Sequence, residues 1–501
     1  MRQGPVLLAL AVLAACGPRH PFPGITSDDG GPTLADRVGL AGGLPWGDSA
    51  QAKAERATEL GRMKSLGLHR MRLDLTWSQI ETAPGQFDFS GLDPAVRDAS
   101  QAGISLLGIL DYGNHIYPTA SSQAGSTDVG QQDHSPPVDV AHYADYVRAV
   151  VAHFRPQVTE YELWNEPNVW SRFFLPKADP VKYAALARAG VDAGRQACPT
   201  CTFVLAGVSM PQPMPPPFAG LSPDGLDYLH DVYRAAPDLN RWVDAVAFHP
   251  YQYPKDPPEQ ETEPYPGYVQ GSLSTQTKNV QALEGGQEGK PPPLWVTEDG
   301  WSTNPDVPST DAELGQVMGL SPSLVADARG MLGETAFERL VETMRGVSEA
   351  DQGRDLERAI LLSASLGIAR FYVYTLADSG DHPEYNQEAA FGVYRDDGSP
   401  KPAAPVLSTL LTRFGSLRYS SDVTAALGLS QPDRALAFRD GSRSVLALWR
   451  WQQGTQGVEI DSLPGATTVV ASDGRVLATK AKGDSLELTV GPDVAWVEVA
   501  R

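Results

Sequence analysis

Two glutamates in the sequence lie in local patterns that suit acid–base chemistry. Glu166 lies in YELWNEPN, residues 161–168, where a short apolar run with one charge facing outward stops at Asn-Glu-Pro-Asn. Pro167 lacks an N–H and disfavours helix for the residue before it, so the run has the length of one buried strand with Glu166 at its carboxyl end. A carboxylate held there, beside an amide and an indole, suits a general acid; the alternative is a cap on an exposed turn. Glu298, in PLWVTEDGW, ends a second such run.

Cleavage of a glycosidic bond is the reaction that two carboxylates on opposite sides of one cleft suit best. One carboxyl group must be protonated to assist the leaving oxygen, and the other must be ionised to attack the anomeric carbon. Their proximity drives their pKa values apart, so the pair can divide these roles near neutral pH. We therefore assign Glu298 as the nucleophile and Glu166 as the acid/base. We expect their carboxyl groups to lie about 5 Å apart, the separation of retaining enzymes.

Further polar and aromatic residues are predicted at strand ends around this pair. Arg72 could hold Glu298 ionised, and Tyr251 could donate a hydrogen bond to it. Three tryptophans could form stacking walls for sugar rings, and Asn165 could donate to a sugar 2-hydroxyl. For His115 a simple loop role is an equal alternative. The candidate substrate-binding residues are Arg72, Trp77, Asn114, His115, Trp164, Asn165, His249, Tyr251, Trp301 and Tyr374.

The segments that carry these residues alternate between short apolar strands and amphipathic helices. Strands are predicted at residues 38–46, 69–75, 104–110, 164–166, 203–208, 243–251, 293–301 and 371–376. Helices are predicted between them at residues 50–66, 94–102, 138–154, 180–196, 226–235, 275–283 and 334–366, with a closing helix at 403–413. Eight strand–helix units favour an α/β fold of the (β/α)8 TIM-barrel type over a doubly wound sheet. In such a barrel the carboxyl ends of all strands meet at one face, which would unite the candidate residues.

The motifs around these residues resemble those of clan A retaining glycoside hydrolases. They are WNEPN, TE-x-G-W, R-x-D-x-x-W followed by IE-x-x-P-G-x-F-D-F-S, H-P-Y on the sixth strand, and FGVYRDDGSPKPA before the last helix. Within the clan the pattern is most similar to the family 39-like group, which includes β-xylosidases, iduronidases and bacterial exopolysaccharide endohydrolases. The resemblance spans residues 38–414 and implies a retaining β-glycosidase acting on a polysaccharide or oligosaccharide. A non-catalytic glycan-binding barrel is the alternative, although a binder needs no buried carboxylate pair.

Residues outside these motifs bear on substrate shape and domain organisation. Three long loops, residues 112–137, 253–271 and 301–333, would rim the cleft and decide whether it is a groove or a pocket. The barrel is expected to occupy residues 37–414. After residue 414 the pattern changes to short alternating runs between turns such as Asp440-Gly441 and Asp473-Gly474. These runs predict a C-terminal antiparallel β-sandwich over residues 415–501, without the aromatic stripe of a separate sugar-binding module.

The N-terminal segment resembles a bacterial lipoprotein signal. The apolar run at residues 6–15 is too short to span a bilayer, and it ends at Leu13-Ala14-Ala15-Cys16. Residues 1–16 would be the signal, Cys16 the lipidated residue, and residues 17–36 a flexible tether; an ordinary signal peptide that contains a cysteine is the alternative. We therefore expect the protein in the bacterial cell envelope, lipid-anchored at the outer membrane or cell surface, or secreted, with the lipid at Cys16 as its one membrane attachment.

The remaining cysteines and the charge of the chain narrow the ligand classes. Cys198 and Cys201 form a C-x-x-C that could be a redox pair or half a zinc site. In an exported protein a local disulfide is the simpler interpretation. With no second cysteine pair or nearby histidine pair in the sequence, we expect no metal and no cofactor. The net charge of −21 and the lack of any Lys/Arg cluster argue against a nucleic-acid partner, and no protein partner is evident.

Overall fold

The computed structural model describes the chain except for residues 1–18, 26, 170–171, 211–222, 253–255, 266–267, 319, 381–382, 478–479, 483 and 501. Contacts divide it into two compact units. One contains Asp29–Tyr419 and Ser472–Gly474, and the other contains Ser420–Ala471, Arg475–Arg501 and the described residues up to Asp28. The change of unit at Tyr419 lies close to the predicted change of texture after residue 414. Among the described residues, no helix has the length and apolar character needed to cross a bilayer.

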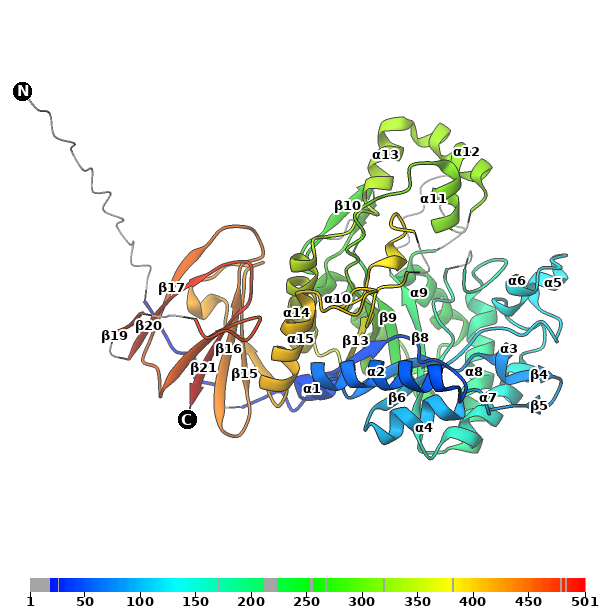
Figure 1. Ribbon diagram of the computed structural model, residues 1–501, viewed down its shortest axis with the longest axis horizontal. Helices are drawn as coiled ribbons and strands as arrows, with labels where there is room; N and C mark the ends of the chain where they lie inside the picture. Colours follow the sequence, from blue (N-terminus) through cyan, green and yellow to red (C-terminus); the bar gives the residue numbers. More distant parts are fainter. Residues whose placement is uncertain are drawn as a thin grey trace, which may run out of the picture. The chain divides into compact units, whose positions relative to one another are not determined.

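The larger unit is a closed barrel of parallel strands (Figure 1). The strands are β2 Val38–Ala41, β3 Arg70–Asp74, β6 Ser105–Leu110, β7 Val158–Leu163, β8 Thr202–Ser209, β9 Ala245–His249, β12 Leu294–Asp299 and β13 Arg370–Tyr374. They pair in sequence order, and β13 closes the barrel on β2. The helices between and after them are α2 Ala50–Leu66, α4 Asp93–Gln101, α7 Val140–Phe154, α8 Pro180–Ala197, α9 Gly225–Ala235, α10 Leu273–Gly285, α14 Glu349–Ser365 and α15 Ala403–Ser408. The predicted (β/α)8 TIM barrel is confirmed.

Helix α2 shows how local sequence sets the barrel's elements. Ser49 precedes it, and its side chain accepts a hydrogen bond from the Ala52 N–H at 3.1 Å, which caps the amino end. Gly67 ends the helix with φ 81°, a left-handed conformation that glycine adopts without a Cβ penalty. Met63 and Leu66 face the core between these caps. The observed bounds are those that the sequence predicts. The closing helix differs from its prediction, because α15 continues as the π-helical turn Thr409–Arg413.

The strand that carries the WNEPN motif begins and ends earlier than predicted. Strand β7 is Val158–Leu163, so residues 164–166 form no strand. Trp164 and Glu166 have φ values of 78° and 42°, a region that non-glycine residues rarely adopt. The backbone N–H of Trp164 donates to Leu110 O at 3.2 Å and that of Glu166 to Gly207 O at 3.0 Å, so both neighbouring strands hold the turn. Backbone strain of this kind persists where the surrounding structure enforces it, commonly at functional sites.

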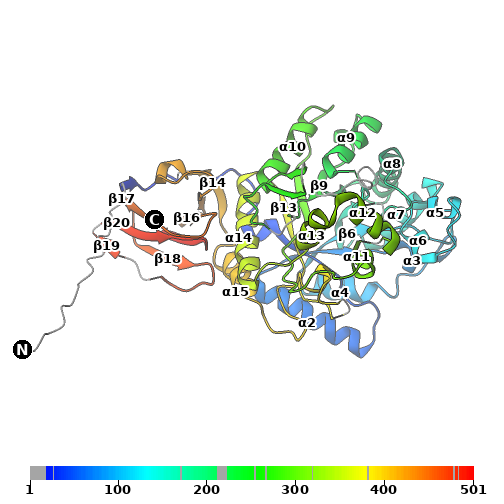
Figure 2. The same ribbon diagram turned by 90° about the horizontal axis from the view of Figure 1, so that it is seen from above.

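Several shorter elements interrupt the βα pattern on the loops. They are α1 Leu34–Arg37, α3 Trp77–Ile80, β4 Glu81–Ala83, β5 Gln86–Phe87, α5 Ala120–Gln123, α6 Val129–Asp133, the 3-10 turns Leu239–Arg241 and Gln387–Ala389, β10 Thr262–Tyr265 and β11 Tyr268–Gln270. Between β12 and α14 lie three further helices, α11 Asp311–Met318, α12 Pro322–Leu332 and α13 Glu334–Glu342. We call residues 311–344 the cap. In both views the three cap helices lie together at one side of the barrel (Figures 1 and 2). The predicted loop at residues 301–333 is therefore partly helical.

The smaller unit is the predicted β-sandwich. One sheet has the order β14-β15-β16-β21-β18 and the other β1-β17-β20-β19. Their strands are β1 Arg19–Pro21, β14 Arg418–Asp422, β15 Arg434–Arg439, β16 Arg443–Trp449, β17 Gln456–Asp461, β18 Thr467–Ala471, β19 Lys480–Lys482, β20 Ser485–Val490 and β21 Ala495–Ala500, with the 3-10 turn Ala425–Leu427. Apolar residues of both sheets, such as Leu446, Val497 and Leu486, share one buried core.

The predicted flexible tether at residues 17–36 is wrong for the part that the structure describes. Strand β1 pairs in parallel with β17, with Arg19 opposite Glu459. Ile25 is 6% exposed and belongs to the sandwich core. Thr33 caps helix α1 by accepting from the Asp36 N–H. Pairing with β17, burial of Ile25 and the cap at Thr33 thus order a segment whose Pro/Gly/Asp composition predicted a tether. Cys16 and the predicted signal lie outside the described residues.

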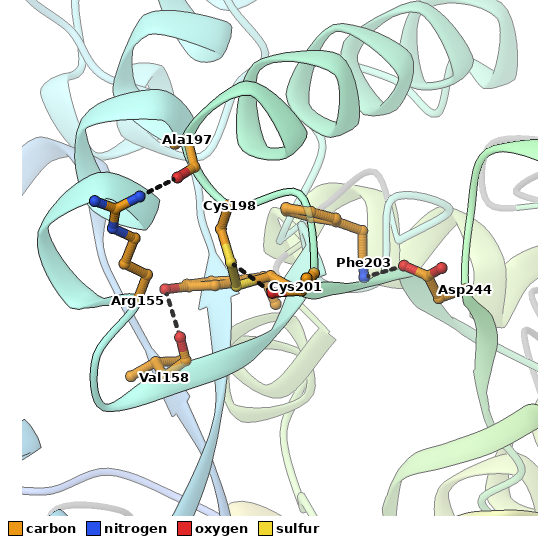
Figure 3. The surroundings of a disulfide bond; sticks show 9 residues. Arg155, Val158, Ala197, Cys198, Cys201, Phe203 and Asp244 are labelled. Atoms are coloured by element: carbon orange, nitrogen blue, oxygen red, sulfur yellow. Dashed lines mark hydrogen bonds between the residues drawn. A yellow bond between two sulfur atoms is a disulfide. The ribbon is translucent and has the colours of Figure 1, made fainter.

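The predicted local disulfide is present between Cys198 and Cys201 (Figure 3). Cys198 is the residue after α8, and Cys201 directly precedes β8. Their Cα atoms lie 5.4 Å apart. Arg155 donates to Ala197 O at 2.9 Å, and the Phe203 N–H donates to Asp244 Oδ2 at 2.8 Å, so both ends of this turn are held. The disulfide fixes the connection between α8 and the amino end of β8.

Candidate active site

A cavity of about 500 Å³ opens at the carboxyl ends of the barrel strands. Its size lies within the roughly 300–1,000 Å³ of small-molecule sites. Polar and aromatic residues from the strand ends and the loops that follow line one wall: Arg72, Asp74, Tyr112, Asn165, Glu166, Arg172, Tyr251, Glu298, Tyr374 and Glu388. The cap lines another part with Val317, Met318, Leu340, Thr343 and Met344. A cavity is thus present at the barrel face where the sequence analysis places the site.

Glu166 and Glu298 both lie beside His249. One carboxylate oxygen of each glutamate and one ring nitrogen of His249 all lie within 4.8 Å of one another. Glu166 Oε1 is 2.8 Å from His249 Nδ1, which is 3.8 Å from Glu298 Oε2. The glutamates retain little exposure, 8% for Glu166 and 13% for the Glu298 side chain. The oxygens thus meet the separation of about 5 Å that the sequence analysis expects for two carboxylates of a retaining enzyme.

Arg72 connects three strands beneath this pair. Its guanidinium donates to Glu162 Oε2 at 2.6 Å, to Glu298 Oε1 at 2.5 Å and to Asn165 Oδ1 at 2.8 Å. Burial opposes the charge, but the carboxylates of Glu162 and Glu298 outweigh it and raise the pKa of Arg72. A planar guanidinium with several donors fixes its partners in direction as well as distance. Arg72 therefore stays charged and orients both Glu298 and Asn165.

Glu162 is a site residue that the sequence analysis missed. The outward-facing charge expected in the YELW run is wholly buried inside the barrel. Glu162 accepts from Arg72, from the Gly207 N–H at 2.8 Å and from Thr297 Oγ1 at 3.0 Å. Successive residues of a barrel strand point alternately into the barrel interior and outward to the helices that surround it. Neither direction leads to solvent. Once the barrel is inferred, an inward glutamate opposite an inward arginine is the signal that would have found it.

The surroundings of Glu298 act on its ionisation in opposite directions. Burial raises the pKa of Glu298, and the charges of His249 and Arg72 offset only part of this rise. The Tyr251 hydroxyl, which donates to Glu298 Oε2 at 3.0 Å, also lowers this pKa. The hydrogen bond that the sequence analysis expected from Tyr251 is thus present, and so is the contact expected from Arg72. Both stabilise the ionised form that a nucleophile requires.

His249 lies behind the two glutamates and does not line the cavity. It is fully buried, and its Nε2 lies 3.0 Å from Thr297 Oγ1. Burial would lower the pKa of His249, but the negative charges of Glu298 and Glu166 outweigh this effect and raise it. The predicted direct contact with substrate is therefore wrong, and His249 acts by positioning Glu166. Protonated His249 would also supply positive charge between the two carboxylates.

The three tryptophans predicted as stacking walls belong to the core. Trp77, Trp164 and Trp301 are among the fully buried side chains, and none lines the cavity. Their indole N–H groups donate inward, at 2.6 Å to Glu81 Oε2, 2.7 Å to Phe173 O and 2.9 Å to Asp256 O respectively. The side chains of the three tryptophans do not point into the cavity, contrary to what the sequence analysis expected. Their large aromatic rings instead fill the space between strand ends and helices.

Asn114 and His115 also lie away from the cavity. Asn114 is buried and donates to Glu81 O at 2.8 Å, which fixes the loop after β6. His115 Nδ1 lies 2.8 Å from Asp133 Oδ1, and the side chain is 40% exposed. The loop role that the sequence left open for His115 is the one observed. Of the other predicted contacts, Asn165 and Tyr374 line the cavity as expected.

The loops contribute cavity residues that the sequence analysis did not propose for the site. Arg172 follows the WNEPN turn and donates to Glu388 Oε1 at 3.3 Å. The Tyr374 hydroxyl donates to Glu388 Oε2 at 3.0 Å. Phe173 and Phe391 add apolar surface beside this group. Such residues lie on long loops whose paths depend on tertiary packing. The sequence therefore carries no signal that they meet, beyond the convergence of all loops at one face of a barrel.

The spacing of Glu166, His249 and Glu298 could in principle suit a metal ion. However, both Glu298 oxygens already accept, one from Arg72 at 2.5 Å and one from Tyr251 at 3.0 Å. A charged guanidinium in contact with the same carboxylate also repels a cation. The donor set therefore fits an acid–base pair better than a metal centre, and the absence of a metal stays a prediction from the sequence.

Solved structures resemble the chain over nearly its full length. Neither a protein-family model nor a curated protein matches the sequence. A family 39 glycoside hydrolase from Bacteroides cellulosilyticus WH2 is 19% identical, with 94% of this chain and 82% of that chain covered and a TM-score of 0.64. A GH39 β-xylosidase from Caulobacter crescentus is 14% identical, with 95% and 98% covered and a TM-score of 0.61. The likeness establishes the fold.

A second glycoside hydrolase family shares the same architecture. A GH30 endoxylanase from Clostridium papyrosolvens C71 is 12% identical, with 94% of this chain and 98% of that chain covered and a TM-score of 0.54. The fold of this chain is thus shared by enzymes that differ widely in sequence. At such low identity the activity of this chain has to be argued from its own site.

Proposed function

We propose that the protein is a retaining glycoside hydrolase that cleaves β-glycosidic bonds of an oligosaccharide or polysaccharide. The observation that carries the proposal is the spacing of Glu166 and Glu298, since one carboxylate oxygen of each lies within 4.8 Å of the other. Inverting enzymes separate their carboxyl groups by roughly 6.5–9.5 Å to admit a water molecule. The shorter spacing suits direct attack by one carboxylate on the anomeric carbon.

The reaction would proceed by double displacement. Glu298 attacks the anomeric carbon while Glu166 protonates the glycosidic oxygen, so the bond to the leaving group breaks as a glycosyl ester forms. Glu166 then takes a proton from a water molecule that attacks the same carbon, and the ester bond to Glu298 breaks. Glu166 recovers its proton, and the sugar leaves with its anomeric configuration retained.

The neighbours of the two glutamates support this division of roles. Arg72 and Tyr251 both donate to Glu298, which favours its ionised, nucleophilic form. Glu166 instead contacts His249, a group that can carry a proton itself. Asn165 is held by Arg72 through Oδ1 and donates to Tyr112 through Nδ2. Its second Nδ2 hydrogen is the candidate donor to a sugar 2-hydroxyl.

The named structural neighbours are consistent with this class of reaction. They are described as a family 39 glycoside hydrolase, a β-xylosidase and an endoxylanase. We extend to this chain only the coarse property that they share, hydrolysis of a glycosidic bond. The carbohydrate substrate of this protein is thereby a proposal, as is the assignment of residues within its site.

A non-catalytic glycan-binding barrel is the second candidate function. Burial of two carboxylates costs free energy unless charges and hydrogen bonds compensate it. Here the compensation requires Arg72, His249 and Tyr251 around one carboxylate pair. A surface that only recognises sugar hydroxyls gains nothing from such a pair, so the arrangement favours the enzyme.

Hydrolysis of a panel of aryl β-glycosides and exopolysaccharides by protein without residues 1–16 tests the proposal. Wild type would be compared with Glu298→Ala and Glu166→Ala. We expect Glu298→Ala to lose activity, and azide to restore turnover in Glu166→Ala on an activated aryl glycoside, with a β-glycosyl azide as product. Binding of one glycan by all three proteins, with hydrolysis by none, would replace the enzyme with the binding module.

We further propose that the protein is located in the bacterial cell envelope, where a lipid on Cys16 anchors it to a membrane. Secretion without this anchor is the alternative. The support is the sequence at Leu13-Ala14-Ala15-Cys16 after a short apolar run. Metabolic labelling with radioactive palmitate in a bacterial host would test this. We expect label in the wild type and none in Cys16→Ser; equal labelling of both proteins, or of neither, would contradict the anchor.

A further inference from the structure

The cap presents an aliphatic surface to the cavity. Val317 and Met318 come from the last turn of α11, Leu340 from α13 and Met344 from the residues that follow, with Thr343 as a polar member. The strand-end wall, by contrast, supplies charged and hydrogen-bonding groups. Val317, Met318 and Met344 are only partly buried, so they keep surface that a bound molecule could cover.

The cap is a built structure with a core of its own. Leu314, Leu320, Val325, Ala328 and Phe337 form a buried cluster among its helices. Arg329 joins α12 to Asp311 at 2.6 Å. The Gly346 N–H donates to Asn304 O at 3.0 Å and the Val347 N–H to Ser302 O at 2.9 Å, which ties the end of the cap to the loop after β12. Because β12 carries Glu298, the aliphatic surface has a fixed attachment close to the nucleophile.

A sugar ring is a poor occupant for the cap side of the cavity. Its hydroxyl groups need hydrogen-bond partners when they leave water, and aliphatic side chains supply none. The strand-end wall has those partners in Arg72, Asp74 and Asn165, among others. The sugar that reacts must also place its anomeric carbon between Glu166 and Glu298. The part of the substrate beyond the glycosidic oxygen is therefore the part that can contact the cap.

The loop after Glu166 extends the apolar lining toward the leaving group. Val169 and Phe173 follow the acid/base residue in sequence and line the same cavity as the cap. The proton donor of a glycosidase lies next to the leaving-group oxygen, so these residues border the leaving-group side. Methionine side chains adapt to apolar groups of varied shape, which suits Met318 and Met344 to such a subsite.

We propose that the cap forms a subsite for an apolar leaving group, so the β-glycosides that the enzyme cleaves best are those of an alkyl or aryl alcohol. This replaces the oligosaccharide or polysaccharide named above with a smaller class of substrate and keeps the reaction. The cavity of about 500 Å³ has room for a ligand of that size. The inference rests on the proposed glycosidase function, and it adds the chemical class of the leaving group and the residues that select it.

A series of n-alkyl β-glycosides tests the proposal. Methyl, butyl and octyl β-D-xylosides and β-D-glucosides, below their micelle concentrations, have leaving alcohols of nearly equal acidity, so differences in kcat/KM report contacts of the alkyl chain. We expect kcat/KM of the wild type to rise about threefold per added methylene from methyl to butyl, the effect of burying each group. A flat or falling series overturns the proposal, as does a higher kcat/KM on an unsubstituted polysaccharide that is cut internally.

Matched methionine variants locate the subsite. Met318→Ser and Met344→Ser should each lower the octyl-to-methyl ratio of kcat/KM about tenfold. Met331→Ser makes the same chemical change on α12, where the side chain is 60% exposed and outside the cavity lining, and should keep the wild-type ratio. Equal ratios in all three variants would show that the cap does not contact the alkyl chain and would overturn the proposal.

Binding of non-hydrolysable analogues separates this inference from the proposed function. Calorimetric titration with methyl and octyl 1-thio-β-D-xylosides and 1-thio-β-D-glucosides requires no turnover. Tighter octyl binding by the wild type than by Met318→Ser supports the apolar subsite even if no glycoside is hydrolysed. Hydrolysis without any preference for octyl over methyl, in rate or in binding, leaves the glycosidase proposal standing and removes the subsite.

Discussion

The strand-end wall and the cap line the same cavity but are held in different ways. Arg72 alone links Glu162 and Asn165 with Glu298, and so joins three parts of the closed barrel through buried charged contacts. The cap is held by a small apolar cluster and a few backbone hydrogen bonds to the loop after β12. The closed barrel thus holds the residues proposed for catalysis. The contacts that would select a substrate come from an insertion, which can vary without disturbing the barrel.

Removal of the nucleophile should have the largest effect and should confirm the strand-end wall as the reacting part. We expect Glu298→Ala to lower kcat/KM on an aryl β-glycoside by about 10⁴–10⁶-fold, since no other group can form the glycosyl ester. Initial-rate kinetics would measure the loss. Glu284→Ala, a buried glutamate on α10 outside the cavity, is the control and should lose far less. Comparable losses in both variants would refute the assignment.

Removal of the Arg72 guanidinium should have the next largest effect. Arg72→Met leaves Glu162 buried without its charged partner and raises the pKa of Glu298 further, because Arg72 lowers that pKa in the wild type. We expect kcat/KM to fall about 10²–10³-fold and the free energy of unfolding to fall by about 3–5 kcal/mol. Kinetics and denaturant titration would measure these losses.

Arg70→Met is the matched control for the Arg72 variant. Arg70 lies on the same strand and pairs with Glu160 at 3.2 Å, outside the cavity lining. Its side chain keeps 19% exposure, so water can compensate part of the loss. Activity should stay near that of the wild type. If Arg70→Met and Arg72→Met lost equal activity, a general effect on barrel stability would explain both.

The pH dependence should show how the wall tunes its nucleophile. Burial raises the pKa of Glu298, so the acid limb of kcat/KM should lie above the ordinary range of a glutamate, about 4.3. Tyr251→Phe removes a hydrogen bond that lowers this pKa, so the limb should move to higher pH. We expect kcat/KM at the optimum to fall about tenfold. A limb that stayed in place or moved to lower pH would show that another group sets it.

A lesion in the core of the cap should sharpen the contrast between the two regions. Phe337 does not itself line the cavity, but the cluster it belongs to packs against Met318 and Met344, which do. We expect Phe337→Ala to weaken the cap by about 3–5 kcal/mol. Amide hydrogen exchange should quicken across α11–α13 and stay slow in the barrel strands. Turnover of a methyl glycoside should change by less than that of an octyl glycoside. Faster exchange throughout the barrel would contradict the separate stability of the cap.

The disulfide should matter least to activity, since it lies at the amino end of β8, and the opposite end of that strand lines the cavity. Its loop contains four residues, for which chain entropy gives a contribution of about 2 kcal/mol to the free energy of unfolding. The double variant Cys198→Ser with Cys201→Ser should therefore lower Tm modestly and leave kcat/KM within about twofold. A large loss of activity would instead link this turn to the geometry of the site.

The repeated βα pattern made much of the fold predictable from the amino-acid sequence. The bounds of α2 follow from Ser49 and Gly67, and the strand order follows from the number of units and the handedness of their connections. Local signals failed where composition misled. The Pro- and Gly-rich segment after residue 17 reads as a tether, yet Arg19–Pro21 adds a strand to β17 and Ile25 enters the sandwich core.

The types of residue at the candidate site were predictable from the sequence. Which of them reach the cavity and which lie behind its lining was not. Glu166, Glu298, Arg72, Asn165 and Tyr251 were proposed because the predicted strands carry them toward the barrel face where strand ends converge. The sequence does not state how far each side chain reaches into the cavity. Trp77, Trp164 and Trp301 occupy motif positions as well, and only packing against neighbouring helices turns them into core residues.

The sequence by itself therefore determined the barrel, the sandwich and the identity of the two facing glutamates. These depend on periodicity and on turn chemistry, which are local. The tertiary structure alone decided that Glu162 turns inward beneath Arg72, that His249 lies behind the carboxylates and that the cap faces the cavity with aliphatic groups. These outcomes depend on contacts between segments far apart in the chain. The free energy of burying each side chain depends on its partners there, and no local sequence pattern identifies those partners.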